Sequence, residues 1–109
     1  MKNIENIIIY PTRDGNHFKR HECEGICTNA GGNAYYIQFL KTKKWFDERR
    51  FFLSPGDQLG APETDRDFTV TDITIAAKRP RYVTVTATLD SEPLSLKTLR
   101  WQEALHREI

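Results

Sequence analysis

Residues 68–89, FTVTDITIAAKRPRYVTVTATL, decide the fold, because they contain two β-branched segments on either side of a short basic turn. Every second residue from Val83 to Leu89 is apolar, and the residues between them are threonines. Successive side chains of a strand point to opposite faces, so this alternation is typical of a strand with one buried and one solvated face. The stretch therefore predicts a β-hairpin, Phe68–Ala77 and Tyr82–Leu89, with its tip at Lys78–Arg81.

The first strand of this hairpin contains an irregularity. Its apolar residues change parity, since Phe68 and Val70 have even numbers whereas Ile73 and Ile75 have odd numbers. One extra residue in the strand would return both pairs to the same face. We therefore expect a β-bulge near Thr71-Asp72.

Three further strands are expected upstream of the hairpin, in the N-terminal part of the chain. They are the apolar segments Ile4–Arg13, His17–Thr28 and Ala34–Leu40. Asp14-Gly15 is a strong signal for a tight hairpin turn, because glycine accepts a positive φ angle without cost. Residues 29–33 provide the second turn.

The middle of the chain is less regular. Residues 41–44 are expected to form a turn, and Trp45–Leu53 is a fourth apolar element. Residues 47–50 interrupt that element as either a bulge or a tight turn, and its periodicity does not decide between them. Residues 54–66 are expected to form one long loop, which in a small domain is often functional.

A final helix is predicted over residues 95–108, with Ser95 as its N-cap. Its apolar residues form an arc that would dock through Trp101 and Leu105. An adjacent arc is basic and contains Lys97, Arg100 and Arg107.

Together these elements predict one domain over residues 1–109. The expected fold is mainly β, a small SH3-like or OB-like barrel of five to six antiparallel strands with a C-terminal α-helix. The helix that an OB barrel carries between its third and fourth strands has no counterpart in the predicted elements, which weakens the OB version.

Composition limits the class of partner and the compartment. The formal net charge is +1, so any argument for nucleic-acid binding has to rest on the distribution of charge. The longest apolar run, Ile7–Tyr10, is too short to span a membrane, and no signal peptide is recognisable. Cys23 and Cys27 are therefore expected to be reduced thiols in a cytoplasmic protein.

Two histidines and two cysteines, His17, His21, Cys23 and Cys27, are residue types that bind zinc. On one extended strand, however, His17 and Cys27 would lie about 33 Å apart, too far to share an ion. Core packing of the cysteines is the favoured interpretation, although a sharp bend at Gly25 would bring some of the four together. No catalytic or phosphate-loop motif is recognisable, so we expect a non-enzymatic protein without a metal or other cofactor.

The segment 35–52 is the candidate binding region, because it holds 7 of the 12 aromatic residues with five cations between them. Single-stranded nucleic acid is bound by such a mixture, since bases stack on aromatic rings while lysine and arginine contact phosphates. The hairpin tip adds three cations. The candidate nucleic-acid-binding residues are Tyr36, Lys41, Lys43, Lys44, Trp45, Arg49, Arg50, Lys78, Arg79 and Arg81.

Adjacent aromatic residues support an exposed surface. In an extended chain one member of each pair, Tyr35/Tyr36, Trp45/Phe46 and Phe51/Phe52, points away from the core. The same surface fits a second hypothesis, a protein-interaction module that binds another protein or a second copy of the chain. Asp47 and Glu48 lie within the segment and would repel phosphate, and the outward aromatics could instead pack under the final helix.

Overall fold

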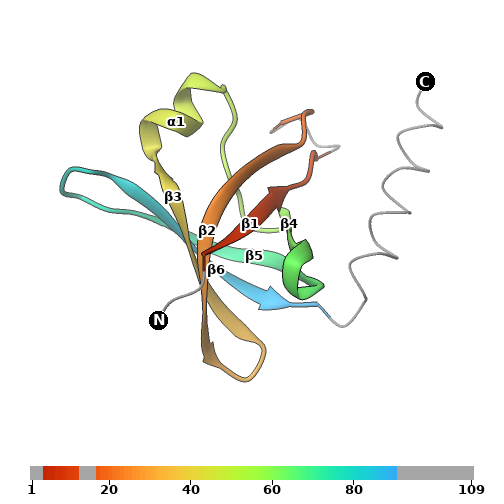
Figure 1. The fold of residues 1–109 in the computed structure, drawn as a ribbon. Helices are drawn as coiled ribbons and strands as arrows, with labels where there is room; N and C mark the ends of the chain where they lie inside the picture. The colour runs from red at the N-terminus through yellow and green to blue at the C-terminus, as the bar shows by residue number, and fades with distance from the viewer. Residues whose placement is uncertain (1–3, 13–16, 91–109) are drawn as a thin grey trace, which may run out of the picture.

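Six antiparallel strands close into a barrel in the order β1-β2-β3-β6-β5-β4 in the computed structural model, which describes residues 4–12 and 17–90 (Figure 1). Pairing of Ile8 with Gly60 and of Ile9 with Leu59 joins the first strand to the fourth and closes the barrel. The predicted mainly β fold with five to six antiparallel strands is confirmed. The elements are β1 (Ile4–Ile9), β2 (His21–Gly31), β3 (Ala34–Thr42), α1 (Lys43–Glu48), β4 (Gln58–Ala61), the 3-10 turn η1 (Pro62–Thr64), β5 (Arg66–Ile75) and β6 (Tyr82–Leu89).

The interior of the barrel is filled by alternate residues of all six strands, as in other small barrels. In every strand except β5 the core residues all have odd numbers, as expected when successive side chains point to opposite faces. Two aromatic residues outside the strands, Phe46 and Phe51, complete the core from one end. The core residues from the strands are Ile7, Ile9, Cys23, Ile37, Phe39, Leu59, Ala61, Phe68, Val70, Val83, Val85 and Ala87.

The predicted bulge in β5 is confirmed. Val70 lies opposite Ala87 and Asp72 lies opposite Thr86, with a shift of register between them. The Thr71 hydroxyl donates a hydrogen bond of 3.0 Å to the carbonyl oxygen of Thr86. The extra residue allows both the even and the odd apolar residues of β5 to face the core.

The prediction for residues 41–53 is wrong. Residues 41 and 42 belong to β3, and residues 43–48 form the helix α1. Phe46 is buried on one side of this helix, while Lys43 and Asp47, four residues apart, form an ion pair on another side. The polar residues 47–50 are thus the last turn and end of a helix, and a helix does lie between the third and fourth strands.

The prediction of one loop over residues 54–66 is also wrong, because that segment contains β4 and η1. Residues 58–61 have the sequence QLGA, which is too short and too rich in small residues to be recognised as a strand. Tertiary pairing makes them one: β4 lies between β1 and β5, with Gly60 opposite Asp67.

Other expected boundaries move by a few residues. β1 ends at Ile9 and β2 begins at His21, so both are shorter at that end than predicted. The expected turn at Asp14-Gly15 lies outside the described residues. The final helix over residues 95–108, with its docking face at Trp101 and Leu105, also lies outside them. Within the described ranges no helix is long and apolar enough to cross a bilayer.

Gly25 provides a test of the barrel packing. A Cβ atom at this buried position would lie 3.0 Å from Cγ1 of Ile7 and 3.1 Å from the carbonyl oxygen of Gln38. Because the carbonyl belongs to the neighbouring strand β3, it cannot yield as a side chain can. Gly25→Val should lower the free energy of unfolding by about 1–3 kcal/mol in urea denaturation.

The matched control is the neighbouring exposed residue of the same strand. Glu24→Thr should change the free energy of unfolding by less than about 0.5 kcal/mol. Equal stability of the Gly25→Val and Glu24→Thr proteins would contradict the close approach of β2 and β3.

Candidate nucleic-acid interface

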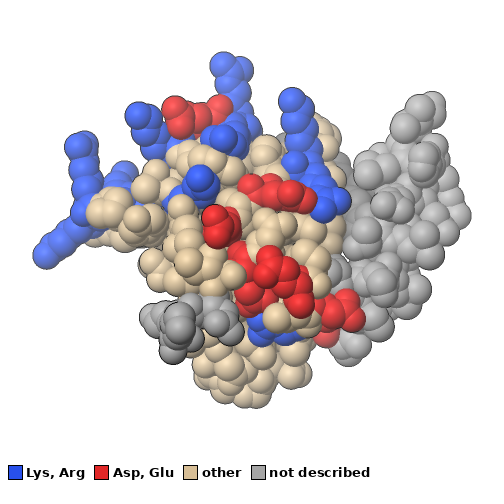
Figure 2. Space-filling view, viewed as in Figure 1, with Lys and Arg blue, Asp and Glu red and all other residues tan. Residues whose placement is uncertain are grey.

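Neighbouring strands alternate in direction around the barrel, so the connections gather at its two ends. We call one of them the α1 end; it comprises residues 10–12, 17–22, 41–57 and 76–82. Ten of the eleven lysines and arginines in the described residues lie there, and only Arg66 lies elsewhere. In Figure 2 these side chains are concentrated along the top and left of the molecule, whereas carboxylates spread over the centre of that face. The ten cations are Lys19, Arg20, Lys41, Lys43, Lys44, Arg49, Arg50, Lys78, Arg79 and Arg81.

Carboxylates at the α1 end do not cancel this charge. Only four of the eleven described carboxylates lie there, so ten cations and four carboxylates leave a formal charge of +6. Glu22 forms an ion pair of 2.7 Å with Arg20, Asp47 pairs with Lys43, and Asp57 is buried against His17. The rest of the described barrel holds one cation and seven carboxylates, a formal charge of −6. The described part of the chain is therefore strongly polarised, although its formal charges sum to zero.

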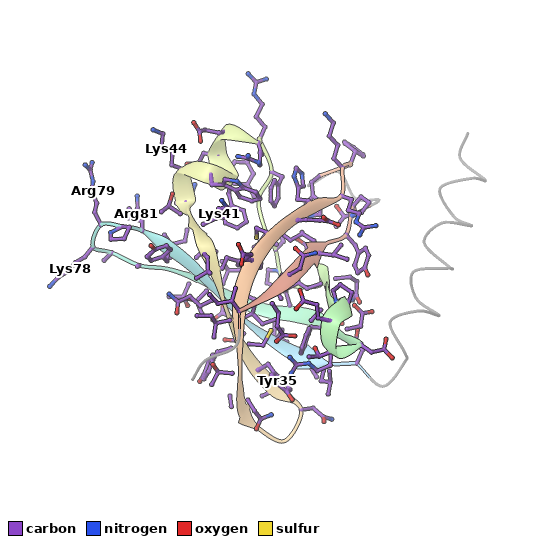
Figure 3. All side chains as sticks on the ribbon, viewed as in Figure 1. Tyr35, Lys41, Lys44, Lys78, Arg79 and Arg81 are labelled. Atoms are coloured by element: carbon purple, nitrogen blue, oxygen red, sulfur yellow. The ribbon has the colours of Figure 1, made fainter. Side chains whose placement is uncertain are left out.

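A groove of about 720 Å³ runs between α1 and the tip of the β5–β6 hairpin. The backbone N–H of Lys43 donates a hydrogen bond of 2.8 Å to the carbonyl oxygen of Arg81, which holds the start of α1 against the hairpin. Figure 3 shows Lys44, Arg79 and Arg81 around this region, with Tyr35 near the opposite end of the barrel. The groove is lined by Thr42, Lys43, Lys44, Asp47, Arg79, Pro80 and Arg81.

The groove presents cations that are not compensated locally. Lys44, Arg79 and Arg81 are exposed and form no ion pair with any other described residue. Asp47 also lines the groove, but its carboxylate is occupied by Lys43. The expected repulsion of phosphate by Asp47 is thereby reduced, and the groove suits an anion.

Trp45 and Arg49, two other predicted binding residues, pack against each other on a different face of α1. The guanidinium carbon of Arg49 lies 4.1 Å from the centre of the Trp45 ring, and its Nη1 donates a 3.1 Å hydrogen bond to the Trp45 carbonyl oxygen. Lys41 Nζ approaches the same ring at 6.0 Å. A cation already covers the indole, so it is not an open platform for a base.

The remaining predicted residues lie outside the groove. Tyr36 is 52% exposed but lies on the outer face of the barrel, opposite Thr28 and Thr86. It is six residues before Thr42, which places it roughly 20 Å away along β3. Arg50 and Lys78 are exposed at the α1 end without lining the groove.

The expected exposure of one aromatic residue in each pair holds for two of the three pairs. Tyr36 and Phe52 are exposed, whereas their neighbours Tyr35 and Phe51 face the core. Trp45 and Phe46 are instead on a helix. Phe52 is 60% exposed at the α1 end and was not among the predicted binding residues, although the pairing of aromatics pointed to it.

The histidines and cysteines do not assemble into a metal site. His17 is buried with its Nε2 3.4 Å from Oδ2 of Asp57, and that oxygen also accepts a 2.9 Å hydrogen bond from the Ser54 N–H. His21 stacks on Phe51 with ring centres 4.0 Å apart. Among residues 4–12 and 17–90, no three histidine, cysteine, aspartate or glutamate side chains are grouped so as to hold a metal ion.

Both cysteines are free thiols, with Cys23 buried and Cys27 half-buried. Burial raises the pKa of each thiol to about 12. Neither is therefore an activated nucleophile, since it is the thiolate that reacts.

Comparison of the chain with models of protein families, with curated proteins and with solved structures finds no match.

The thiol pKa values predict slow alkylation of the native protein. With a pKa of about 12, only about one Cys23 or Cys27 side chain in ten thousand is a thiolate near pH 8. Iodoacetamide should label both cysteines at least about a hundredfold more slowly in the native protein than in denaturant, as followed by mass spectrometry. Native labelling as fast as that of the denatured chain would contradict the burial of both thiols.

His21 predicts a pH dependence of stability. Burial, and then the charges of His17, Arg49 and Lys19, lower the pKa of His21 below its usual value of 6.5. The unfolded chain thus binds a proton more readily, so stability is greatest above pH 6.5 and falls as the pH drops through the lowered pKa. Urea midpoints at about pH 7.5 and about pH 5.5 should show this decline. His21→Phe, which retains a ring against Phe51, should reduce it; an unchanged decline would exclude His21 as its source.

Proposed function

We propose that this protein is a non-enzymatic module that binds single-stranded nucleic acid, DNA or RNA, through the α1 end. The observation that carries the proposal is the groove between α1 and the hairpin tip, where Lys44, Arg79 and Arg81 are exposed and uncompensated. Lysine and arginine in such an arrangement contact successive phosphates of a strand. Exposed aromatic side chains at the same end, Phe18 and Phe52, favour a single strand, because its bases are free to stack.

We also propose that the barrel is OB-like rather than SH3-like, the two classes expected from the sequence. The OB-like class is supported by α1, which lies between the third and fourth strands, where an OB barrel carries its helix. OB barrels commonly bind oligonucleotides, which agrees with the proposed ligand.

We also propose that the protein acts in the cytosol. Its support is the presence of two free thiols at Cys23 and Cys27 and the absence of a disulfide between described residues. Disulfides are rare in reducing compartments, where a nucleic-acid partner would also be found.

The proposal is tested by the salt dependence of binding to a fluorescently labelled single-stranded oligonucleotide. Lys44→Gln/Arg79→Gln removes two groove cations, so it should weaken binding several-fold at moderate salt. The slope of log affinity against log salt should become shallower by about 1.4, because each lost phosphate contact with a single strand contributes about 0.7.

The control variant has the same net charge. Thr28→Glu/Thr88→Glu adds two negative charges at exposed positions on β2 and β6, outside the groove. This variant should retain the wild-type slope. Equal weakening of both double variants would show attraction by net charge alone, and no binding even at low salt would refute the proposal.

The second candidate function is a protein-interaction module. It is favoured by Tyr36, which is 52% exposed on the outer face of β3, away from the α1 end. Light scattering on the isolated protein separates the candidates. A stable self-associated species without salt-dependent oligonucleotide binding would favour protein interaction.

A further inference from the structure

The backbone after α1 determines which aromatic side chain is exposed. The helix ends with hydrogen bonds from Arg50 N–H to the Asp47 carbonyl oxygen and from Phe51 N–H to the Phe46 carbonyl oxygen. Arg50 is in the left-handed region, with a φ angle of 54°, which is uncommon for a non-glycine residue. This reversal of the chain places the Phe51 ring in the core at 1% exposure and leaves Phe52 60% exposed.

Phe52 lies next to the cationic groove, because Lys43 both contacts Phe52 and lines the groove. Lys43 Nζ lies over the Phe52 ring at 5.5 Å from its centre, farther than Arg49 from the Trp45 ring at 4.1 Å, and the Phe52 ring remains 60% exposed. On the other side of Lys43 the surface is a shallow apolar depression of about 70 Å³. Phe52 lines the depression together with Phe46, Phe51 and apolar residues of β5 and β6.

The size of the depression limits how a ligand can sit. About 70 Å³ is enough for only a few atoms, so a flat group would lie over the Phe52 ring rather than insert beside it. A nucleic-acid base is such a group, and its stacking on an aromatic ring tolerates any sequence. The phosphate attached to that nucleotide would then face the uncompensated groove cations Lys44, Arg79 and Arg81, because Lys43 is paired with Asp47.

Charge and shape together favour a nucleotide over other ligands. An acidic peptide would pair with Lys44, Arg79 and Arg81 but gain nothing from Phe52. An apolar peptide would contact the Phe52 ring. It would also remove water from the neighbouring groove cations without pairing them, which is unfavourable. A nucleotide satisfies both parts at once, because it joins a π-face to a charged group.

We propose that Phe52, with Lys43 beside it, is a base-stacking subsite of the α1 end, next to the phosphate-binding groove. The subsite rests on the proposed function. It adds a residue that contacts a base, whereas the groove contacts the phosphates of the nucleic-acid strand. It makes binding depend on bases as well as on charge, without discriminating among base types.

The test compares two labelled strands of equal length, an oligothymidylate and its abasic counterpart, on wild type and Phe52→Ala. Loss of one stacking contact should weaken binding of the oligothymidylate about 5- to 150-fold. Phe52→Ala should change binding of the abasic strand less than about twofold, since that strand has no base to stack. Phe52→Trp should restore affinity for the oligothymidylate, because indole also stacks.

Two controls separate this subsite from the phosphate-binding groove. Tyr36→Ala removes an aromatic ring of similar exposure on the outer face of β3 and should leave both affinities unchanged. Lys44→Gln/Arg79→Gln should weaken both strands alike, because both carry phosphates. Circular dichroism and urea denaturation should show that Phe52→Ala is folded, because the Phe52 side chain is 60% exposed.

The outcomes are distinguishable. If Phe52→Ala weakens both strands equally or neither, the subsite is wrong while the groove can still be correct. If neither strand binds wild type at low salt, the proposed function fails as well. Binding of polyglutamate as tight as that of the oligothymidylate, and insensitive to Phe52→Ala, would instead assign the α1 end to an acidic protein partner.

Discussion

Pairing of β1 with β4 closes the barrel, and this closure determines where the core and the candidate interface lie. Closure gives each of the six strands two neighbours and encloses a core made of alternate residues from every strand. Because successive strands around the barrel run in opposite directions, closure also fixes which connections share an end. The loop before β2, the α1 segment and the β5–β6 tip meet for this reason, although they are separated by tens of residues in sequence.

Charge follows from that arrangement. The chain has a formal net charge of +1, yet the α1 end carries nearly all described cations and most described carboxylates lie elsewhere. A polarised surface of this kind steers and orients an oppositely charged partner even when the net charge is small. Nonspecific attraction is correspondingly weak beyond the basic end, because the carboxylates elsewhere repel an anionic strand.

The α1 segment has two roles in one short stretch. Phe46 and Phe51 pack into the open end of the barrel, and this packing holds the helix and the left-handed residue Arg50 in place. The same segment presents Lys43, Lys44 and Phe52 outward. Core packing thus positions the candidate interface, so substitutions of Phe46 or Phe51 would disturb both the stability of the barrel and the placement of Lys43, Lys44 and Phe52.

Elements with a local pattern could be predicted from the amino-acid sequence alone. Alternation in residues 82–89 and the parity change in β5 predicted a half-buried strand and a bulge, because period-two burial is visible without knowing the partner strand. Adjacent aromatics likewise predicted that one of Phe51 and Phe52 faces outward.

Tertiary contacts alone make the short segment QLGA the strand that closes the barrel and make residues 43–48 a helix. Both are too short for periodicity and are stabilised by contacts with residues distant in sequence. The separation of Tyr36 from the groove, and the meeting of Lys43 and Lys44 with Arg79 and Arg81, were decided in the same way. Those distances depend on which strand ends share one end of the barrel, and that is set by closure.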